Sequence, residues 1–393
     1  MNLAGTDPAI TTTPAEDWRA AGFGVYVHWP FCLAKCPYCD FNSHVSGNVD
    51  QDQWRAALVA EVRAARALTG PRAVDTVFFG GGTPSLMPAE TVGAIIEAIH
   101  SEWGLADGAE VSLEANPTSV EAARFKGYAA AGVNRISMGV QALNDPDLKA
   151  LGRMHSAAEA RAAFDVARSV FSRVSFDLIY ARQGQTLKDW EAELAQAMAM
   201  AVDHLSLYQL TIEQGTRFGD LADRGKLRDL PSDDLSADMY ALTQQVTAGA
   251  GMPAYEVSNH ARLGAESRHN NIYWRYGDYA GIGPGAHGRF TLDGVRQGTT
   301  TPRDPAAWLS TAGQFQFERV ANTDAASEHL MMGLRLAEGI DTGRYERLAG
   351  ASLDQAVIAE LTSEGFLQSD EQRISATEKG RPVLNAVLRR LLV

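Results

Sequence analysis

The three cysteines of this chain lie within eight residues of one another. They are Cys32, Cys36 and Cys39, their spacing is C-x3-C-x2-C, and the chain has no other thiol. Three thiolates can bind three irons of a 4Fe–4S cluster and leave the fourth iron open for another ligand. A protein that only transfers electrons normally closes the cluster with a fourth cysteine, so this set favours a cluster with an open iron.

Other uses of the cysteines can be weighed from the residues around them. A structural zinc ion takes four ligands, and His28 or His44 could complete a Cys3His set, so zinc stays an alternative. Buried free cysteines pack as small hydrophobes, but Lys35, Pro37 and Asp40 interrupt any apolar face here. A disulfide framework is excluded, because the number of cysteines is odd and the chain is large enough to need no such support.

The composition is that of an ordinary globular protein. Of the 393 residues, 45% are hydrophobic and 21% are charged, which predicts a large core spread over two or three domains. The net charge of −13 disfavours binding to a nucleic-acid backbone. Residues 1–21 lack the basic and apolar stretches of a signal peptide and are predicted to be a disordered leader. No apolar run reaches the length of a membrane span, and the few cysteines favour the reducing cytoplasm.

From Gly24 onwards, short apolar runs alternate with stretches of helical period. The predicted strands are 25–28, 76–79, 110–114, 135–140, 174–180 and 205–211, and the predicted helices are 53–68, 89–102, 120–130, 157–170, 187–200 and 234–248. Six strand–helix units predict a parallel sheet with right-handed crossovers. Polar residues follow several of the strands, at residues 80–83 and at Glu114, Gln141 and Asp177. This favours an α/β fold, a partial (β/α)6 barrel of the TIM type with its chemistry at the carboxyl ends of the strands.

The barrel is predicted to span residues 22–255. Residues 256–320 are predicted to be a connecting segment, and its part from 259 to 289 is rich in Gly, His, Tyr and Trp without a helical period, so a loop is expected there. Residues 321–393 predict a helical, winged-helix-like domain whose wing is formed by 366–368 and 373–375. Acidic residues outnumber basic ones between Asp324 and Arg373, which favours protein contacts over DNA.

The neighbours of the cysteines make the pattern more specific. Several motifs follow one another in a fixed order. They are the cysteine motif with Tyr38 before its last cysteine, the loop VFFGGGTPS at 77–85, and the later segments SLEANP, RISMGVQ, LGRMH and SFDLIY. This set resembles the radical S-adenosylmethionine (radical SAM) superfamily, in its coproporphyrinogen-dehydrogenase-like (HemN/HemW) branch. The resemblance implies that S-adenosylmethionine binds the open iron of the cluster, and that its reductive cleavage gives a 5′-deoxyadenosyl radical.

The same resemblance implies the residues that bind this cofactor. Those that would contact the cluster-bound S-adenosylmethionine are Tyr26, Gly81 and Glu114. Those that match positions holding a second S-adenosylmethionine molecule in the dehydrogenase are Tyr38, Gly82, Thr83, Gln141, Arg153 and Asp177. Taken singly, each acid or arginine would be interpreted as part of a salt bridge at the lip of the barrel.

Two later segments also match the branch. They are HNNIYW, residues 269–274, and the glycine-rich GIGPGAHG, residues 281–288. The resemblance implies that His269, Asn270, Tyr273 and Trp274 bind heme, whose iron is commonly held by a neutral imidazole. Without the resemblance, His269 would be a satisfied polar residue in a loop, and the two aromatic residues would cap the barrel.

Two features separate the enzymes of the branch from its heme chaperones. The dehydrogenase has a fourth cysteine two residues after the third, where this chain has Phe41, and it has a longer extension than the 25 residues that precede Tyr26 here. Both features favour the heme-chaperone type, which would bind heme and deliver it to apo-hemoproteins such as respiratory enzymes, with a homodimer as one expected state. The alternative is an enzyme, the oxygen-independent coproporphyrinogen III dehydrogenase, which decarboxylates two propionates. One turn departs from the branch: residues 181–186 read ARQGQT where Gly-Leu-Pro-Gly-Gln-Thr is usual.

Overall fold

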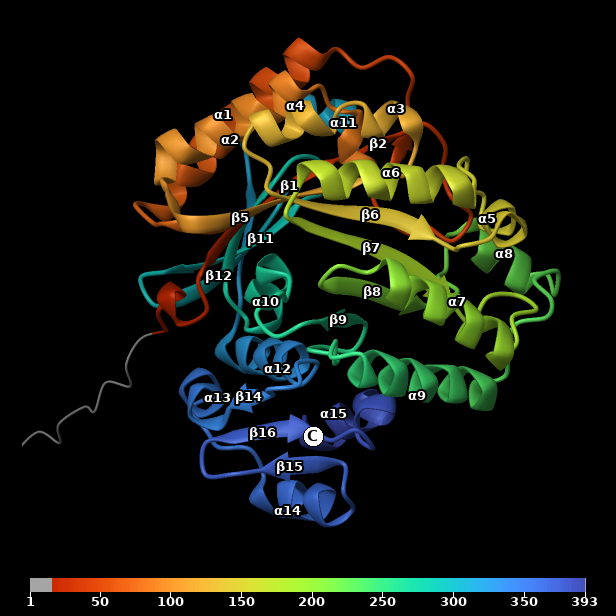
Figure 1. The fold of residues 1–393 in the computed structure, drawn as a ribbon. Helices are drawn as coiled ribbons and strands as arrows, with labels where there is room; N and C mark the ends of the chain where they lie inside the picture. Colours follow the sequence, from red (N-terminus) through yellow and green to blue (C-terminus); the bar gives the residue numbers. More distant parts are fainter. Residues whose placement is uncertain (1–15, 393) are drawn as a thin grey trace, which may run out of the picture.

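The computed structural model describes residues 16–392, so the first fifteen residues of the predicted leader lie outside the described part. Six parallel strands follow one another in both sequence and space (Figure 1). They are β1 (Phe23–Trp29), β4 (Val74–Gly81), β5 (Leu105–Ala115), β6 (Arg135–Gln141), β7 (Arg173–Tyr180) and β8 (His204–Gln209). The predicted partial barrel is confirmed.

Helices connect these strands and cover the outer face of the sheet (Figure 1). The longer ones are α1 (Gln51–Thr69), α2 (Ala89–Trp103), α6 (Ala157–Val170), α7 (Leu187–Met200) and α9 (Asp233–Gly249). The predicted helix at 120–130 is divided into α3 (Ser119–Ala122) and α4 (Phe125–Ala130), and two further short helices are α5 (Asp145–Ala150) and α8 (Arg217–Asp223). Capping fixes several starts: the Ser156 and Thr186 side chains accept hydrogen bonds from backbone amides three residues on.

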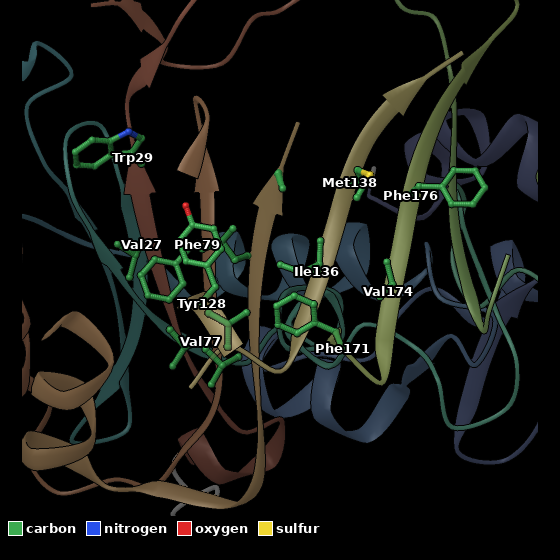
Figure 2. Packing of buried hydrophobic residues seen from close by; sticks show 14 of the residues in the cluster. Val27, Trp29, Val77, Phe79, Tyr128, Ile136, Met138, Phe171, Val174 and Phe176 are labelled. Atoms are coloured by element: carbon green, nitrogen blue, oxygen red, sulfur yellow. The ribbon is translucent and has the colours of Figure 1, made fainter. Parts of the chain in front are cut away.

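The two faces of the sheet differ in chemistry. Alternate residues such as Val27, Val77 and Ile136 are buried against the helices and form the main hydrophobic core (Figure 2). Most of the residues between them are polar, and many of these are buried: Thr76, Glu110, Ser112, Arg135, Ser137, Ser175 and Ser206. An ordinary TIM barrel fills its interior with branched apolar side chains. This polar interior therefore favours binding of polar or charged ligands inside the barrel.

The sheet is wider than the six predicted strands. Within residues 16–392 it has eleven strands. They include β10 (Asp278–Ile282), which pairs in parallel with β1, and the antiparallel β11 (His287–Leu292), β12 (Val295–Thr300) and β13 (Gln316–Arg319). At the other edge, β9 (Asn259–Ala261) pairs antiparallel with β8. The connecting segment thus supplies the strands β9 to β13 to the same sheet, and α11 (Pro305–Ser310) packs Trp308 into the core.

The expected loop at 259–289 is wrong, because this range contains β9, β10 and the start of β11, and because Arg268–Trp274 forms helix α10. The Ser267 side chain caps it by accepting a hydrogen bond from the Asn270 amide. The helix has only seven residues, which is too short for a periodic hydrophobic pattern to be recognised. As a consequence, residues 269 and 273 lie one turn apart on the same face.

The C-terminal domain has its own hydrophobic core. It contains α12 (Asn322–Gly333), α13 (Thr342–Ala349), α14 (Gln355–Ser363) and α15 (Leu384–Leu391), and a sheet of β14 (Ile340–Asp341), β15 (Leu367–Ser369) and β16 (Arg373–Ala376). The antiparallel β15 and β16 form the predicted wing. The exact limits of the three predicted domains stay a prediction. None of the helices in residues 16–392 is long and apolar enough to cross a membrane.

Candidate functional site

The cysteine loop leaves β1 at the carboxyl end of the barrel. It begins with β2 (Phe31–Cys32), which pairs in parallel with β3 (His44–Val45). The Thr83 hydroxyl donates a hydrogen bond to Cys32 Sγ at 3.3 Å, and Arg153 Nη1 donates one to Cys36 Sγ at 3.4 Å. Burial raises the pKa of the Cys32 thiol, whereas the Thr83 hydrogen bond lowers it. Two of the three thiols therefore meet a hydroxyl donor or a cation, which suits a cluster bound through thiolates.

The glycines at 81 and 82 are required by close packing against the start of the cysteine loop. The Gly82 amide donates to the Trp29 carbonyl at 2.6 Å, and the Thr83 amide donates to the Phe31 carbonyl at 2.9 Å. A Cβ on Gly82 would lie 2.8 Å from the Phe31 oxygen, and Gly81 has a φ of 109°. Only glycine fits this approach without moving the backbone that leads into the first cysteine.

One cavity brings the cysteines together with nearly all of the predicted S-adenosylmethionine residues. It is lined by the three cysteines and by eight of those nine residues, namely Tyr38, Gly81, Gly82, Thr83, Glu114, Gln141, Arg153 and Asp177. The ninth, Tyr26, lies in the neighbouring cavity, where its hydroxyl and His28 Nδ1 are 3.0 Å apart. Four parallel strands, β4 to β7, supply Gly81, Glu114, Gln141 and Asp177, as expected when carboxyl ends of parallel strands meet at one edge.

Two carboxyl groups in this cavity are shifted towards their neutral form. Burial, followed by the charge of Asp177, raises the pKa of Glu114 to about 8. Burial raises the pKa of Asp177 to about 6, although hydrogen bonds from Ser206 and Ser137 and the charge of Arg135 oppose the shift. Two such groups become fully ionised when a cation enters beside them. The cavity is thus suited to a positively charged ligand.

Asn116 is a member of the site that was not predicted. Its Oδ1 accepts from Arg153 Nη2 at 2.6 Å, and its Nδ2 donates to the Thr83 hydroxyl at 3.3 Å. It thereby joins the two residues that contact Cys36 and Cys32. The segment SLEANP contained the signal, because Asn116 follows Glu114 by two residues and alternate residues of a strand share a face.

A second and larger cavity, of about 550 Å³, adjoins the first. Its wall includes Tyr273 and Trp274 of α10, together with residues from β10, β11 and α12. It shares three residues with the cysteine cavity, Phe41, Gly81 and Glu114. The volume lies within the range of small-molecule and cofactor sites. Phe41, which stands where the dehydrogenase has its fourth cysteine, thus lies between the two cavities.

His269 is buried beneath this second cavity. It is only 1% exposed, its Nδ1 lies 2.7 Å from the Thr76 hydroxyl, and its Nε2 lies 2.7 Å from the Tyr273 hydroxyl. Burial, aided by the charge of Arg135, lowers its pKa to about 3. The ring packs near Phe78 at 5.1 Å between centroids. Tyr273, whose hydroxyl contacts His269, and Trp274 line the second cavity. Asn270 and His269 line a separate small interior cavity.

The structure gives little support to the alternative of a zinc site at the cysteines. His28 has both ring nitrogens in hydrogen bonds, with Tyr26 and with the Asn42 carbonyl at 2.9 Å. His44 Nε2 lies 3.2 Å from Asn42 Oδ1. Over residues 16–392, no three His, Cys, Asp or Glu side chains are placed to hold a single metal ion.

The altered turn at 181–186 is held by an ion-pair network. Arg182 is 4% exposed and contacts Asp147 and Glu193, both at 2.6 Å. Ala181 has a φ of 56°, a conformation that glycine adopts more easily and that explains the usual glycine at this point. The network holds the turn beside the neighbouring α5, and Asp177 keeps its place in the cysteine cavity.

Comparisons with known proteins agree with this geometry. The family model "Radical SAM superfamily" matches residues 26–197, and the model "HemN C-terminal domain" matches residues 320–383. The heme chaperone HemW of Escherichia coli (strain K12) is 38% identical over 93% of this chain and 96% of its own length. The chain belongs to the radical SAM superfamily. Within it, the predicted HemN/HemW branch is confirmed.

Two further relatives extend the comparison. Radical S-adenosyl methionine domain-containing protein 1, mitochondrial, of Mus musculus is 39% identical over 96% of this chain and 89% of its own length. The solved structure of the coproporphyrinogen III oxidase HemN from Escherichia coli has a TM-score of 0.78, with 22% identity over 95% of this chain and 92% of that chain. This second likeness shows the fold alone and confirms the predicted fold class.

Proposed function

We propose that this protein is a heme chaperone that carries a 4Fe–4S cluster and S-adenosylmethionine and delivers heme to apo-hemoproteins. The observation that carries the proposal is the pair of adjoining cavities. One is lined by the three cysteines, the other by Tyr273 and Trp274 of the HNNIYW segment, and they share Phe41, Gly81 and Glu114. The 38% identity to a relative named heme chaperone HemW supports the same function.

The cluster would be held by Cys32, Cys36 and Cys39. The donor set fits, because all three thiols line one cavity and the other residues of that cavity include no fourth cysteine. A cluster with three cysteine ligands keeps one iron for an exogenous ligand. The hydrogen bonds from Thr83 and Arg153 to the sulfurs would hold the ligands in place and offset the negative charge of the bound cluster.

S-adenosylmethionine would occupy the rest of the same cavity. Its ammonium and sulfonium groups are cations, and Glu114 and Asp177 are the carboxyl groups that line the cavity. Gly81, Gly82 and Thr83 would offer backbone close to the ligand, whereas Tyr26 would act from the boundary with the second cavity. Bound together, the cluster and S-adenosylmethionine would supply one-electron reductive chemistry, and the chain's own part is to position them and exclude water.

Heme would bind in the second cavity as cargo. Tyr273 and Trp274 give this cavity flat aromatic walls. Three arginines also line it: Arg289 and Arg296, which form ion pairs with Glu328 and Asp278, and Arg303, which supplies a positive charge. Such a lining suits a large apolar ring that carries carboxylates. His269 contributes by fixing the Tyr273 hydroxyl from below. Glu328 and Met332 of α12 also line the cavity, so the C-terminal domain forms part of its wall.

The delivery step would use this C-terminal domain. Because α12 lines the heme cavity, a recipient that docks on the domain could change access to the cargo. The recipients would be apo-hemoproteins such as respiratory enzymes in the reducing cytoplasm. The excess of acidic residues in this domain favours a protein partner over DNA.

The test is a titration of anaerobically reconstituted protein with heme, followed by Soret absorbance. The proposal predicts saturation near one heme per chain. A linear, unsaturated response like that of an unrelated acidic protein would contradict it.

The second candidate function is coproporphyrinogen III dehydrogenase. The fold is shared with HemN, but Phe41 stands where that enzyme type has a fourth cysteine. Phe41 is 59% exposed and lines both cavities, so no thiol is available at this point. Decarboxylated product from coproporphyrinogen under anaerobic, reducing conditions would establish the enzyme; we expect none.

A further inference from the structure

The second cavity contains an imidazole whose ring is free to bind a ligand. His287 is the first residue of β11, is exposed, and lines this cavity. No hydrogen bond to its ring is found among residues 16–392. His28, which lines the same cavity, and His269, which lies beneath it, each have both ring nitrogens in hydrogen bonds. Of the two histidines that line the heme cavity, His28 and His287, it is therefore His287 that is placed to donate a lone pair.

The backbone around His287 is rigidly held. The Gly283 amide donates to the buried carboxylate of Glu61 at 2.6 Å, and the Gly283 carbonyl accepts from the Thr301 hydroxyl at 2.6 Å. The Ala286 amide donates to the same hydroxyl at 3.1 Å. A Cβ on Gly281 would lie 2.0 Å from the His287 carbonyl oxygen, so β10 and β11 pack here without any spare room. The backbone that carries the His287 side chain is thus held in place before the cargo binds.

The charges around His287 are positive. Burial, followed by the charges of Arg289 and Arg303, lowers the pKa of His287 below its ordinary value. These surroundings therefore favour the neutral form of the ring, which is the form that binds a metal.

The three arginines of the cavity differ in how they are paired. Arg289 forms an ion pair with Glu328 at 3.0 Å, and Arg296 is buried against Asp278. Arg303 is exposed, and no ion pair to it is found among residues 16–392. It is thus the arginine of this wall that is free to bind a carboxylate of the cargo.

We infer that His287 ligates the iron of heme in this cavity and that Arg303 binds a propionate of the same molecule. The inference rests on the proposed function. It assigns the iron ligand to His287 and gives His269 the task of positioning Tyr273.

The first experiment compares the wild-type protein with His287→Gly and His269→Phe, all anaerobically reconstituted. Each is titrated with ferric heme and followed by Soret absorbance and electron paramagnetic resonance. We expect His287→Gly to lose the histidine-ligated signature and to bind heme about tenfold more weakly. Added imidazole should restore the signature, because it fills the space left by the side chain. His269→Phe should keep the signature.

The second experiment tests Arg303 with two forms of the cargo. Arg303→Gln should bind heme about tenfold more weakly, since a charge-assisted hydrogen bond is lost. It should bind the dimethyl ester of heme as well as the wild-type protein does, because the ester has no carboxylate. Arg224→Gln, an exposed arginine of the barrel outside this cavity, is the matched control and should change neither affinity.

The outcomes separate the inference from the proposed function. A wild-type protein that never saturates with heme overturns both. A wild-type protein that saturates, with a His287→Gly variant of unchanged signature and intact iron and sulfide content, overturns the assignment of His287 alone. Loss of the signature in His269→Phe, with retention in His287→Gly, would assign the iron to His269.

Discussion

The pKa of Glu114 leads to a prediction about how the cofactor binds. Without a ligand, burial and Asp177 hold this pKa at about 8, so only about a tenth of the Glu114 side chains are ionised at pH 7. A cationic ligand is held by the ionised form. The apparent affinity for S-adenosylmethionine should therefore rise with pH until the carboxyl is ionised in the free protein.

The size of this effect follows from the ionised fraction. That fraction is roughly 3% at pH 6.5 and roughly 90% at pH 9 for a pKa near 8, so the Kd should fall about thirtyfold across this range. Most of the change lies below pH 8. Glu114→Gln keeps the shape of the side chain but has no charge that titrates. The Kd of this variant should therefore not show the thirtyfold fall.

The assay is isothermal titration calorimetry of reconstituted protein with S-adenosylmethionine between pH 6.5 and 9. The amino group of S-adenosylmethionine titrates equally in the titrations of the wild-type protein and of Glu114→Gln. The difference between their Kd curves therefore isolates the effect of the Glu114 carboxyl. Asp177→Asn is a second control: it removes a charge that raises the pKa of Glu114, so the midpoint should move to lower pH. Parallel curves for the wild-type protein and Glu114→Gln would refute the reasoning.

Three further predictions concern the cluster and the stability of the fold. Cys36→Ser should lose the cluster, and iron and sulfide contents equal to those of the wild-type protein would contradict its role as a ligand. Gly82→Ala should also contain less cluster, because the added Cβ would lie 2.8 Å from backbone atoms. The control is Gly249→Ala, whose added Cβ would have no atom within 4 Å, and its cluster content should equal that of the wild-type protein. Arg182→Gln should lower the free energy of unfolding by about 3 kcal/mol in a urea titration, because it removes the cation that pairs with the 6% exposed Glu193 carboxylate. Adding Glu193→Gln should recover part of that loss, and an additive double mutant would contradict the network.

Local patterns in the sequence account for much of the barrel. Helix α7 begins and ends at the predicted residues, because a Thr186 cap and a helical period both lie within the segment itself. The strands were recognisable for the same reason, since each buried run is bounded by turn residues. The cysteine cavity followed from the rule that carboxyl ends of parallel strands meet at one edge, and that rule brought Glu114 and Asp177 together.

What the sequence did not reveal depends on contacts between distant residues. The pairing of β10 with β1 joins residues far apart in the chain, and no local pattern specifies it. The heme cavity is likewise assembled from separate elements, so the closeness of Tyr273 to Arg303 and Met332 became visible only in the fold. The burial of His269 also depends on a contact between distant residues, because its hydrogen-bond partner Thr76 belongs to β4.

The central claim is that the second cavity binds heme beside the cluster site. The most direct test is the anaerobic heme titration of the reconstituted wild-type protein, read as Soret absorbance. The account predicts saturable binding near one heme per chain, which Trp274→Ala should weaken because that side chain lines the cavity. A Soret change that never saturates, or one that is identical in the Trp274→Ala variant, would contradict it.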